Sequence, residues 1–148
     1  GGPAVRPYID PDLWQSSTSR VWGGKDVGDR GTWRRSVYVF SKRSIRYPMF
    51  EAFDQPDMVG HCSERASSTV APQALLLMNN AEILLQAKFF AQRLMREAGP
   101  DLDAQIKRAF QLALSRSATP AEKERAVDFI RSNPTGLVDF CQTLFNLN

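Results

Sequence analysis

The sequence has little histidine, little cysteine and no long apolar run. One histidine in 148 residues excludes a metal centre built from several histidines, and two cysteines exclude a disulfide-dense scaffold and a four-cysteine zinc site. No apolar stretch reaches the ~18 residues that a membrane-spanning helix needs, so we predict no membrane span. No basic, apolar leader opens the sequence, so we expect any targeting segment to lie outside this chain.

The length of 148 residues and the hydrophobic fraction of 43% leave room for one domain or for part of a larger one. We therefore interpret residues 1–148 as a single domain or as the C-terminal fragment of a larger domain. The hydrophobic pattern divides it into an irregular arm (1–31), a basic helix and loop (32–68) and a helical bundle (69–148). The expected fold class is mostly α, with about five helices after an aromatic- and proline-rich arm.

Positive charge is concentrated in one segment. Residues 30–46 carry a charge of +6 and no acid, although the whole chain carries only +3. Such a segment can bind phosphate or another polyanion. The favoured alternative is that its arginines anchor an irregular region by binding backbone carbonyls and carboxylates.

The first 31 residues combine chain-breaking residues with large apolar side chains. Three prolines and the four glycines of residues 23–31 interrupt every periodic run, yet Tyr8, Leu13, Trp14 and Trp22 need burial. The arm alone has too little apolar material to order itself. We therefore expect an extended arm that is held on a helical body by its aromatic side chains.

Residues 32–44 are predicted as a helix. Thr32 is a suitable N-cap, and Trp33, Val37 and Phe40 follow a helical period. The competing prediction is a strand, because residues 37–40 are rich in β-forming residues. One short helical turn is expected at 49–53, and then a polar loop over 54–68.

The remaining residues show the clearest helical signals. Helices are expected at 69–78, 81–98, 102–115, 119–131 and 136–147. Asn80 is a predicted N-cap, and Gly99-Pro100 is a predicted stop. Thr119-Pro120-Ala121-Glu122 has the sequence of a capping box with proline at the first helical position.

Two carboxylates, Asp54 and Asp57, are the weak candidates for catalysis. Paired carboxylates can transfer protons or bind a hard cation. The favoured alternative is a structural role, in which each caps a helix or pairs with Arg34, Arg35 or Arg43.

The two cysteines carry no evident chemistry. Cys62 and Cys141 can form a disulfide in an extracytoplasmic protein, or both can be buried as small apolar residues. His61 precedes a lone Cys62, which does not match the attachment motif of haem c, so we expect no cofactor in this segment. Asp57, His61 and Cys62 are weak metal ligands, because adjacent residues rarely reach one ion, and no metal site is predicted.

Six aromatic residues can form either a sugar-stacking platform or the contacts that hold the arm. They are Tyr8, Trp14, Trp22, Trp33, Tyr38 and Tyr47. The binding candidates are Trp14 and Trp33 together with Arg34, Arg35 and Arg43. Nucleic acid is not an expected partner.

Three segments together resemble a known family. Residues 34–43, 49–57 and 69–79 are similar, in order and spacing, to the C-terminal half of domain of unknown function 1553. Gly1-Gly2-Pro3 and Leu13-Trp14 fit its upstream pattern, and Asn146-Leu147-Asn148 fits its downstream pattern. The family is best known from planctomycetes, where it accompanies cytochrome-c-like domains.

The resemblance implies a context but no reaction. It implies an exported, extracytoplasmic bacterial protein with upstream domains and with haem c elsewhere in the polypeptide. Two functions stay open. The first is a structural or interaction module whose partners are the upstream domains of the same polypeptide. The second is a carbohydrate-binding or hydrolytic cleft in a polysaccharide-processing protein, formed by Asp54, Asp57 and nearby arginines.

Overall fold

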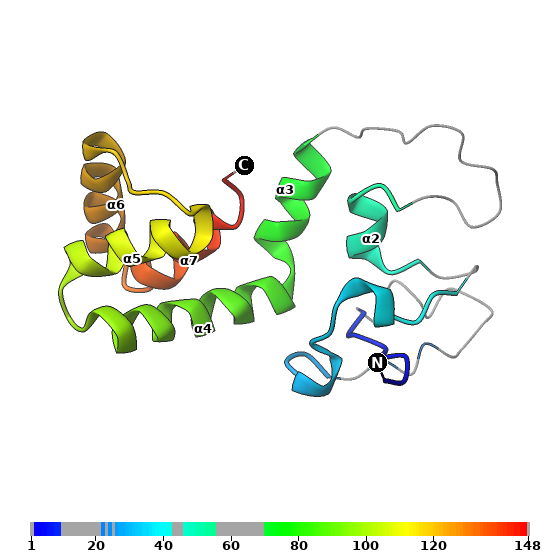
Figure 1. The fold of residues 1–148 in the computed structure, drawn as a ribbon. Helices are drawn as coiled ribbons and strands as arrows, with labels where there is room; N and C mark the ends of the chain where they lie inside the picture. The colour runs from blue at the N-terminus through cyan, green and yellow to red at the C-terminus, as the bar shows by residue number, and fades with distance from the viewer. Residues whose placement is uncertain are drawn as a thin grey trace. The chain divides into compact units, whose positions relative to one another are not determined.

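A computed structural model describes residues 2–9, 22, 24, 26–42, 46–55 and 70–147. In these residues it contains six α-helices and two 3₁₀ turns, which agrees with the predicted mostly α class (Figure 1). The chain divides into two compact units, residues 1–76 and 77–148. No helix among the described residues is long and apolar enough to cross a membrane.

The helices of the C-terminal region agree closely with the predicted ranges. They are α3 (Val70–Asn79), α4 (Ala81–Ala98), α5 (Leu102–Leu114), α6 (Pro120–Ser132) and α7 (Gly136–Leu144). Their ends have the expected chemistry. The Asn80 side chain accepts hydrogen bonds from the backbone N–H groups of Glu82 and Ile83, and Gly99 ends α4 with a φ of 68°.

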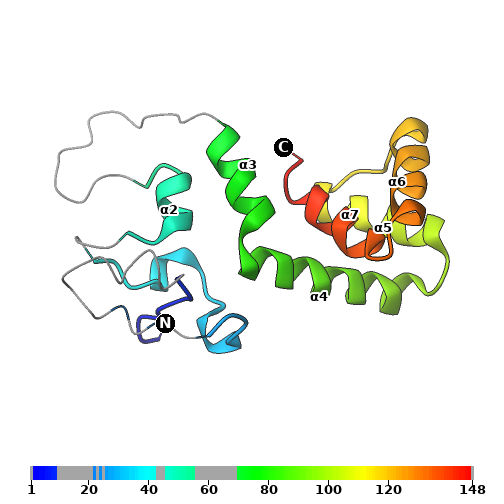
Figure 2. The same ribbon diagram turned by 180° about the vertical axis from the view of Figure 1, so that it is seen from behind.

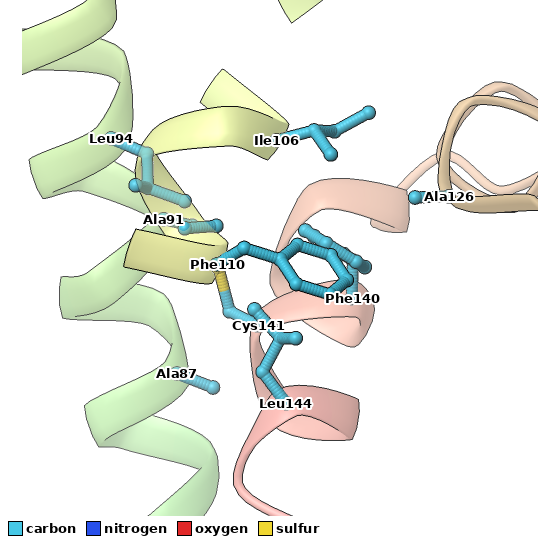
Figure 3. Close-up of a cluster of buried hydrophobic side chains, with 10 residues drawn as sticks. Ala87, Ala91, Leu94, Ile106, Phe110, Ala126, Phe140, Cys141 and Leu144 are labelled. Atoms are coloured by element: carbon cyan, nitrogen blue, oxygen red, sulfur yellow. The ribbon is translucent and has the colours of Figure 1, made fainter. Parts of the chain in front are cut away.

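The C-terminal unit is built around α7, which packs against α4, α5 and α6 (Figure 2). Leu94, Ile106 and Cys141 are fully buried there, and the rings of Phe110 and Phe140 lie 6.2 Å apart (Figure 3). Small residues of the neighbouring helices belong to the same buried cluster: Ala87, Ala91, Ala109 and Ala126. The central turns of α4 and α5 are therefore buried on one side. Away from the buried sides of their helices, Leu84 and Met95 on α4 and Phe129 on α6 are exposed.

Within the C-terminal unit, the end of α3 is bound by a side chain of α7. Gln142 Nε2 donates hydrogen bonds to the backbone oxygens of Met78 (2.7 Å) and Leu77 (3.4 Å). The last carbonyls of a helix have no partner within the helix. Gln142 therefore supplies the donor that these two carbonyls lack.

The predicted helix at 32–44 is wrong over its described residues. The chain forms two 3₁₀ turns instead, η1 (Arg30–Thr32) and η2 (Ser36–Tyr38). Val5 binds this segment from the arm: its N–H donates to Tyr38 O and its carbonyl accepts from Phe40 N–H, both at 2.8 Å. Val5 and Val39 form an isolated parallel β-bridge. This pairing uses the Tyr38 carbonyl and the Phe40 N–H, which therefore cannot form the hydrogen bonds of a helix.

The predicted N-cap and apolar face of that helix also have other roles. Thr32 lies inside η1, where its hydroxyl donates to Asp29 O at 2.7 Å. Trp33 and Val37, two residues of the predicted helical period, are 39% and 78% exposed. A short helix does follow as predicted, α2 (Pro48–Ala52).

The N-terminal unit has a small aromatic core around Trp22. Trp22 is 1% exposed, and its indole N–H donates to Pro7 O at 2.7 Å. Its ring is stacked on Tyr47 at 6.5 Å and lies 6.2 Å from Phe40. Ile9 completes this cluster. The described part of the arm is therefore held by Phe40 and Tyr47, while its placement on residues 69–148 stays a prediction.

The first prediction concerns the turn between α6 and α7. A Cβ at Gly136 would collide with the backbone of Ile130, whereas a Cβ at Gly99 would meet open space and only the strain of a positive φ. We expect Gly136→Ala to lower the free energy of unfolding by more than about 2 kcal/mol, because the Ile130 backbone must move. The cost of Gly99→Ala, about 1 to 3 kcal/mol, comes from backbone strain alone, since its φ of 68° and ψ of −155° are almost exclusive to glycine. Urea unfolding followed by far-UV circular dichroism measures both, and a loss below about 1 kcal/mol in Gly136→Ala would contradict the close packing there.

The second prediction concerns the capping box of α6. Arg116 donates two hydrogen bonds to the Glu122 carboxylate, and the backbone N–H of Thr119 donates another. These contacts lower the pKa of Glu122 from its ordinary value of 4.5 to about 2. Because this pKa is depressed in the folded state, the stabilisation is present above about pH 4.5 and disappears as the pH falls toward 2.

The variant Glu122→Gln keeps the length of the side chain but removes the titrating group. We expect the melting temperature of wild type to fall more steeply between pH 5 and pH 2.5 than that of the variant. With Arg116→Gln, the melting temperature should fall with pH less steeply than in wild type but more steeply than in Glu122→Gln, since the hydrogen bond from Thr119 N–H to Glu122 remains. Identical slopes in wild type and Glu122→Gln would show that this carboxylate contributes nothing to acid sensitivity.

Candidate functional site

Asp54, the first of the predicted carboxylates, follows α2 in a left-handed conformation. Its φ is 56°, its side chain is half-buried, and its backbone N–H donates to Glu51 O at 3.2 Å. Asp57 lies outside the described residues. The structure therefore does not test whether the two carboxylates face each other, and their role in a site stays a prediction.

Of the predicted arginines, Arg34 and Arg35 are described and Arg43 is not. Arg34 Nη1 donates to Pro3 O at 3.4 Å, and its guanidinium lies 5.8 Å from the centre of the Tyr38 ring. This contact with a backbone carbonyl is of the kind expected for an anchoring arginine. Arg35 is exposed and has no carboxylate partner among the described residues.

Of the aromatic binding candidates, Trp33 is described and Trp14 lies outside the described residues. Trp33 is 39% exposed, and the guanidinium of Arg30 lies 5.7 Å from the centre of its ring. A guanidinium at this distance is attracted by the ring quadrupole. Arginine and tryptophan thus share one exposed segment.

A hollow of about 430 Å³ lies in the N-terminal unit, where the arm meets η1. It is lined by residues 4–6, by Asp29, Gly31 and Thr32, and by Phe40. The guanidinium of Arg6 lies over the Phe40 ring, 4.7 Å from its centre. Sequence reasoning missed this site because its two walls are more than 20 residues apart. The only signal in the sequence was Arg6, an arginine in the proline-rich arm that precedes the basic segment.

The electrostatics of this hollow are mixed. Asp29 caps η1, and its Oδ1 accepts a hydrogen bond from Gly31 N–H at 2.8 Å. Arg6 is exposed, and no carboxylate pairs with it in the part of the chain that the structure describes. One wall therefore carries a cation, and the other carries a carboxylate that is engaged in capping η1.

The C-terminal unit has two further hollows of a different character. One, of about 630 Å³, is lined by residues of α4, α5, α7 and the chain after α7, including Phe90, Leu114 and Phe145. The other, of about 390 Å³, lies where Lys123 Nζ binds Asp103 Oδ2 at 2.7 Å. That hollow is also lined by Asp101, whose side chain caps α5, and by Lys107 and Ser117.

The described cysteine is part of the core. Cys141 is a free thiol with no exposed surface, and burial raises its pKa to about 12. A thiol with a raised pKa is a poor nucleophile at neutral pH. Cys62 and His61 lie outside the described residues, so their pairing or metal binding stays untested. Among the described side chains, no three His, Cys, Asp or Glu residues are grouped to hold a metal ion.

Taken together, these features define a mostly α-helical protein with a small aromatic N-terminal unit and a helical C-terminal unit. The chain belongs to the family described as Protein of unknown function (DUF1553), whose model matches residues 1–130. The resemblance read from residues 34–43, 49–57 and 69–79 is thereby confirmed. No curated protein and no solved structure matches the chain. The family match ends within α6, so α7 lies beyond it.

The third prediction separates a structural role of Asp54 from a chemical one. Asparagine is tolerated in the left-handed region, whereas alanine is strained there by about 1 kcal/mol. We expect Asp54→Asn to keep the melting temperature and Asp54→Ala to lower it.

In a screen of glycan and metal binding on the full-length protein, unchanged binding in Asp54→Asn and Asp57→Asn would exclude a site built on these carboxylates.

Proposed function

We propose that this chain is a non-catalytic interaction module of a larger exported bacterial protein. The observation that carries the proposal is the exposure of Val37, which is 78% accessible on η2. An apolar side chain on an ordered turn gains free energy only when another surface covers it.

The neighbours of Val37 have the composition of a protein interface. Arg34 and Arg35 are exposed immediately before η2, and Trp33 is 39% exposed. Arginine and tryptophan are enriched among the residues that dominate interface energies. We call residues 33–37 the contact segment. Its positive charge favours an acidic surface, and the resemblance to proteins with upstream domains supports such a surface within the same polypeptide.

This role leaves the chemistry to other parts of the protein. The candidate carboxylate Asp54 follows a helix of only five residues, and Cys141 is buried with a raised pKa. The alternative of a carbohydrate-binding or hydrolytic cleft through Asp54, Asp57 and the arginines stays a prediction. An extracytoplasmic location and haem c elsewhere in the polypeptide are parts of the proposal that rest on the resemblance.

The fourth prediction is a difference in amide hydrogen exchange between this 148-residue chain and the full-length protein. We expect residues 33–39 to exchange more slowly in the full-length protein, because the contact segment is covered there. Val37→Ser in the full-length protein should speed this exchange at least about fivefold, the equivalent of losing about 1 kcal/mol of contact energy.

The matched control is Met95→Ser, which removes an apolar side chain that is 50% exposed on α4. It should leave exchange at residues 33–39 unchanged. Equal exchange of the contact segment in the short and full-length proteins would refute the proposal. So would a loss of stability in the short chain carrying Val37→Ser, because it would assign Val37 a role within its own unit.

A further inference from the structure

The larger hollow of the C-terminal unit combines apolar walls with a cation. We call it the C-terminal hollow, and its volume of about 630 Å³ lies within the usual range of about 300 to 1,000 Å³ for small-molecule sites. Phenylalanine and leucine residues of α4, α5, α7 and the chain after α7 make up most of its lining. Among the described residues that line it, Arg93 is the only charged one.

The apolar walls are fixed by packing but stay open to solvent in part. The rings of Phe90 and Phe145 are stacked, with their centroids 5.9 Å apart, and both residues pack against the buried cluster around α7. Leu147 lines the same hollow, yet it is 45% exposed. An apolar ligand that covers this surface removes it from water, which is favourable.

The lining residues of α4 indicate an elongated ligand. Gln86, Phe89, Phe90 and Arg93 lie along one side of the helix, because their spacings return to the same face after each turn. From the first to the last of them the helix rises by about 10 Å. An alkyl chain that lies along the phenylalanine rings, with its head at Arg93, matches this length better than a compact ligand does.

Arg93 belongs to a group of three charged side chains in which positive charge is in excess. Its Nε donates to Glu97 Oε1 at 2.6 Å, and Arg108 Nε donates to Glu97 Oε2 at 2.8 Å. These two contacts lower the pKa of Glu97, so a single ionised carboxylate faces two guanidinium groups. In the part of the chain that the structure describes, the hydrogen bond of Arg93 uses Nε alone, and its side chain is 47% exposed. Its two Nη groups can therefore donate parallel hydrogen bonds to an anion.

We propose that the C-terminal hollow binds a fatty acid, with its alkyl chain on the phenylalanine and leucine walls and its carboxylate on Arg93. A neutral apolar molecule would leave the excess positive charge uncompensated, and a small hydrophilic anion would leave the apolar walls uncovered. A cationic amphiphile would be repelled by Arg93. The inference goes beyond the contact segment, because it uses only residues of the C-terminal unit.

The test is a calorimetric titration of the 148-residue chain with decanoate, below its micelle concentration and at about 150 mM salt, which screens long-range attraction. We expect decanoate to bind at least about fivefold more tightly than decanol and decyltrimethylammonium, which carry a ten-carbon chain with a neutral and a cationic head. Octanoate should bind at least about threefold more weakly than decanoate, since two fewer methylene groups are buried.

Two variants test the head and the chain of the ligand separately. Arg93→Gln should weaken decanoate about fivefold and leave decanol unchanged, because only the carboxylate loses its partner. Its matched control, Arg125→Gln, removes an exposed positive charge from α6 and should leave decanoate unchanged. Leu147→Ser should weaken decanoate and decanol alike, by about threefold, whereas Met95→Ser, which lies outside the lining, should weaken neither.

Far-UV circular dichroism checks that each variant keeps its helices. If Arg93→Gln does not fold, Arg93→Lys, which keeps the charge but loses the paired hydrogen bonds, should also weaken decanoate relative to decanol.

Four results would overturn the inference. Equal binding of decanoate and decanol would show an apolar surface that does not select an anion. Unchanged binding of decanoate in folded variants of Arg93 would place its head elsewhere, and unchanged binding in Leu147→Ser would place its chain elsewhere. The fourth is the absence of saturable decanoate binding below about 1 mM. Because the titration and the hydrogen-exchange test of the contact segment probe different residues, either can fail alone.

Discussion

The burial of one apolar face of α7 is the interaction on which the C-terminal unit depends. Phe140, Cys141 and Leu144 lie on that face and pack against three other helices. Close approach is possible because alanines of α4, α5 and α6 belong to the same buried cluster, and because Gly136 places no side chain against the Ile130 backbone. Well-packed interiors tolerate neither added nor removed volume, so these small residues matter as much as the large ones.

The N-terminal unit relies on a much smaller core, and this determines where a site can form. Trp22 holds the arm through Pro7 and packs on Phe40, and Arg6 lies on that same Phe40 ring. One wall of the hollow in this unit is therefore packed on this aromatic core, although the described part of the unit has little regular structure. Loops placed on a fixed base commonly carry binding functions, whereas packed helices mainly supply stability.

Much of the helical fold could be predicted from the sequence, but little of the candidate site could. Helices α4 to α7 have strong periods, and their ends have local signals such as Asn80 and the Thr119–Glu122 capping box. The predicted site residues Asp57, Arg43 and Trp14 lie outside the described residues. Asp54, Arg34, Arg35 and Trp33 are placed, but the hollow is formed by Arg6 and Asp29, which no motif marks.

The sequence by itself determined the elements whose hydrogen bonds close within a few residues. A capping box or a 3.6-residue period is local, so it is readable along the chain. Only the tertiary structure decided the path of residues 30–42, where the period of Trp33, Val37 and Phe40 predicts a helix. There the backbone of Val5, more than 30 residues away, takes the hydrogen bonds of Tyr38 and Phe40. A pairing of distant segments leaves no local pattern, and it is this pairing that brings Arg6 to the hollow.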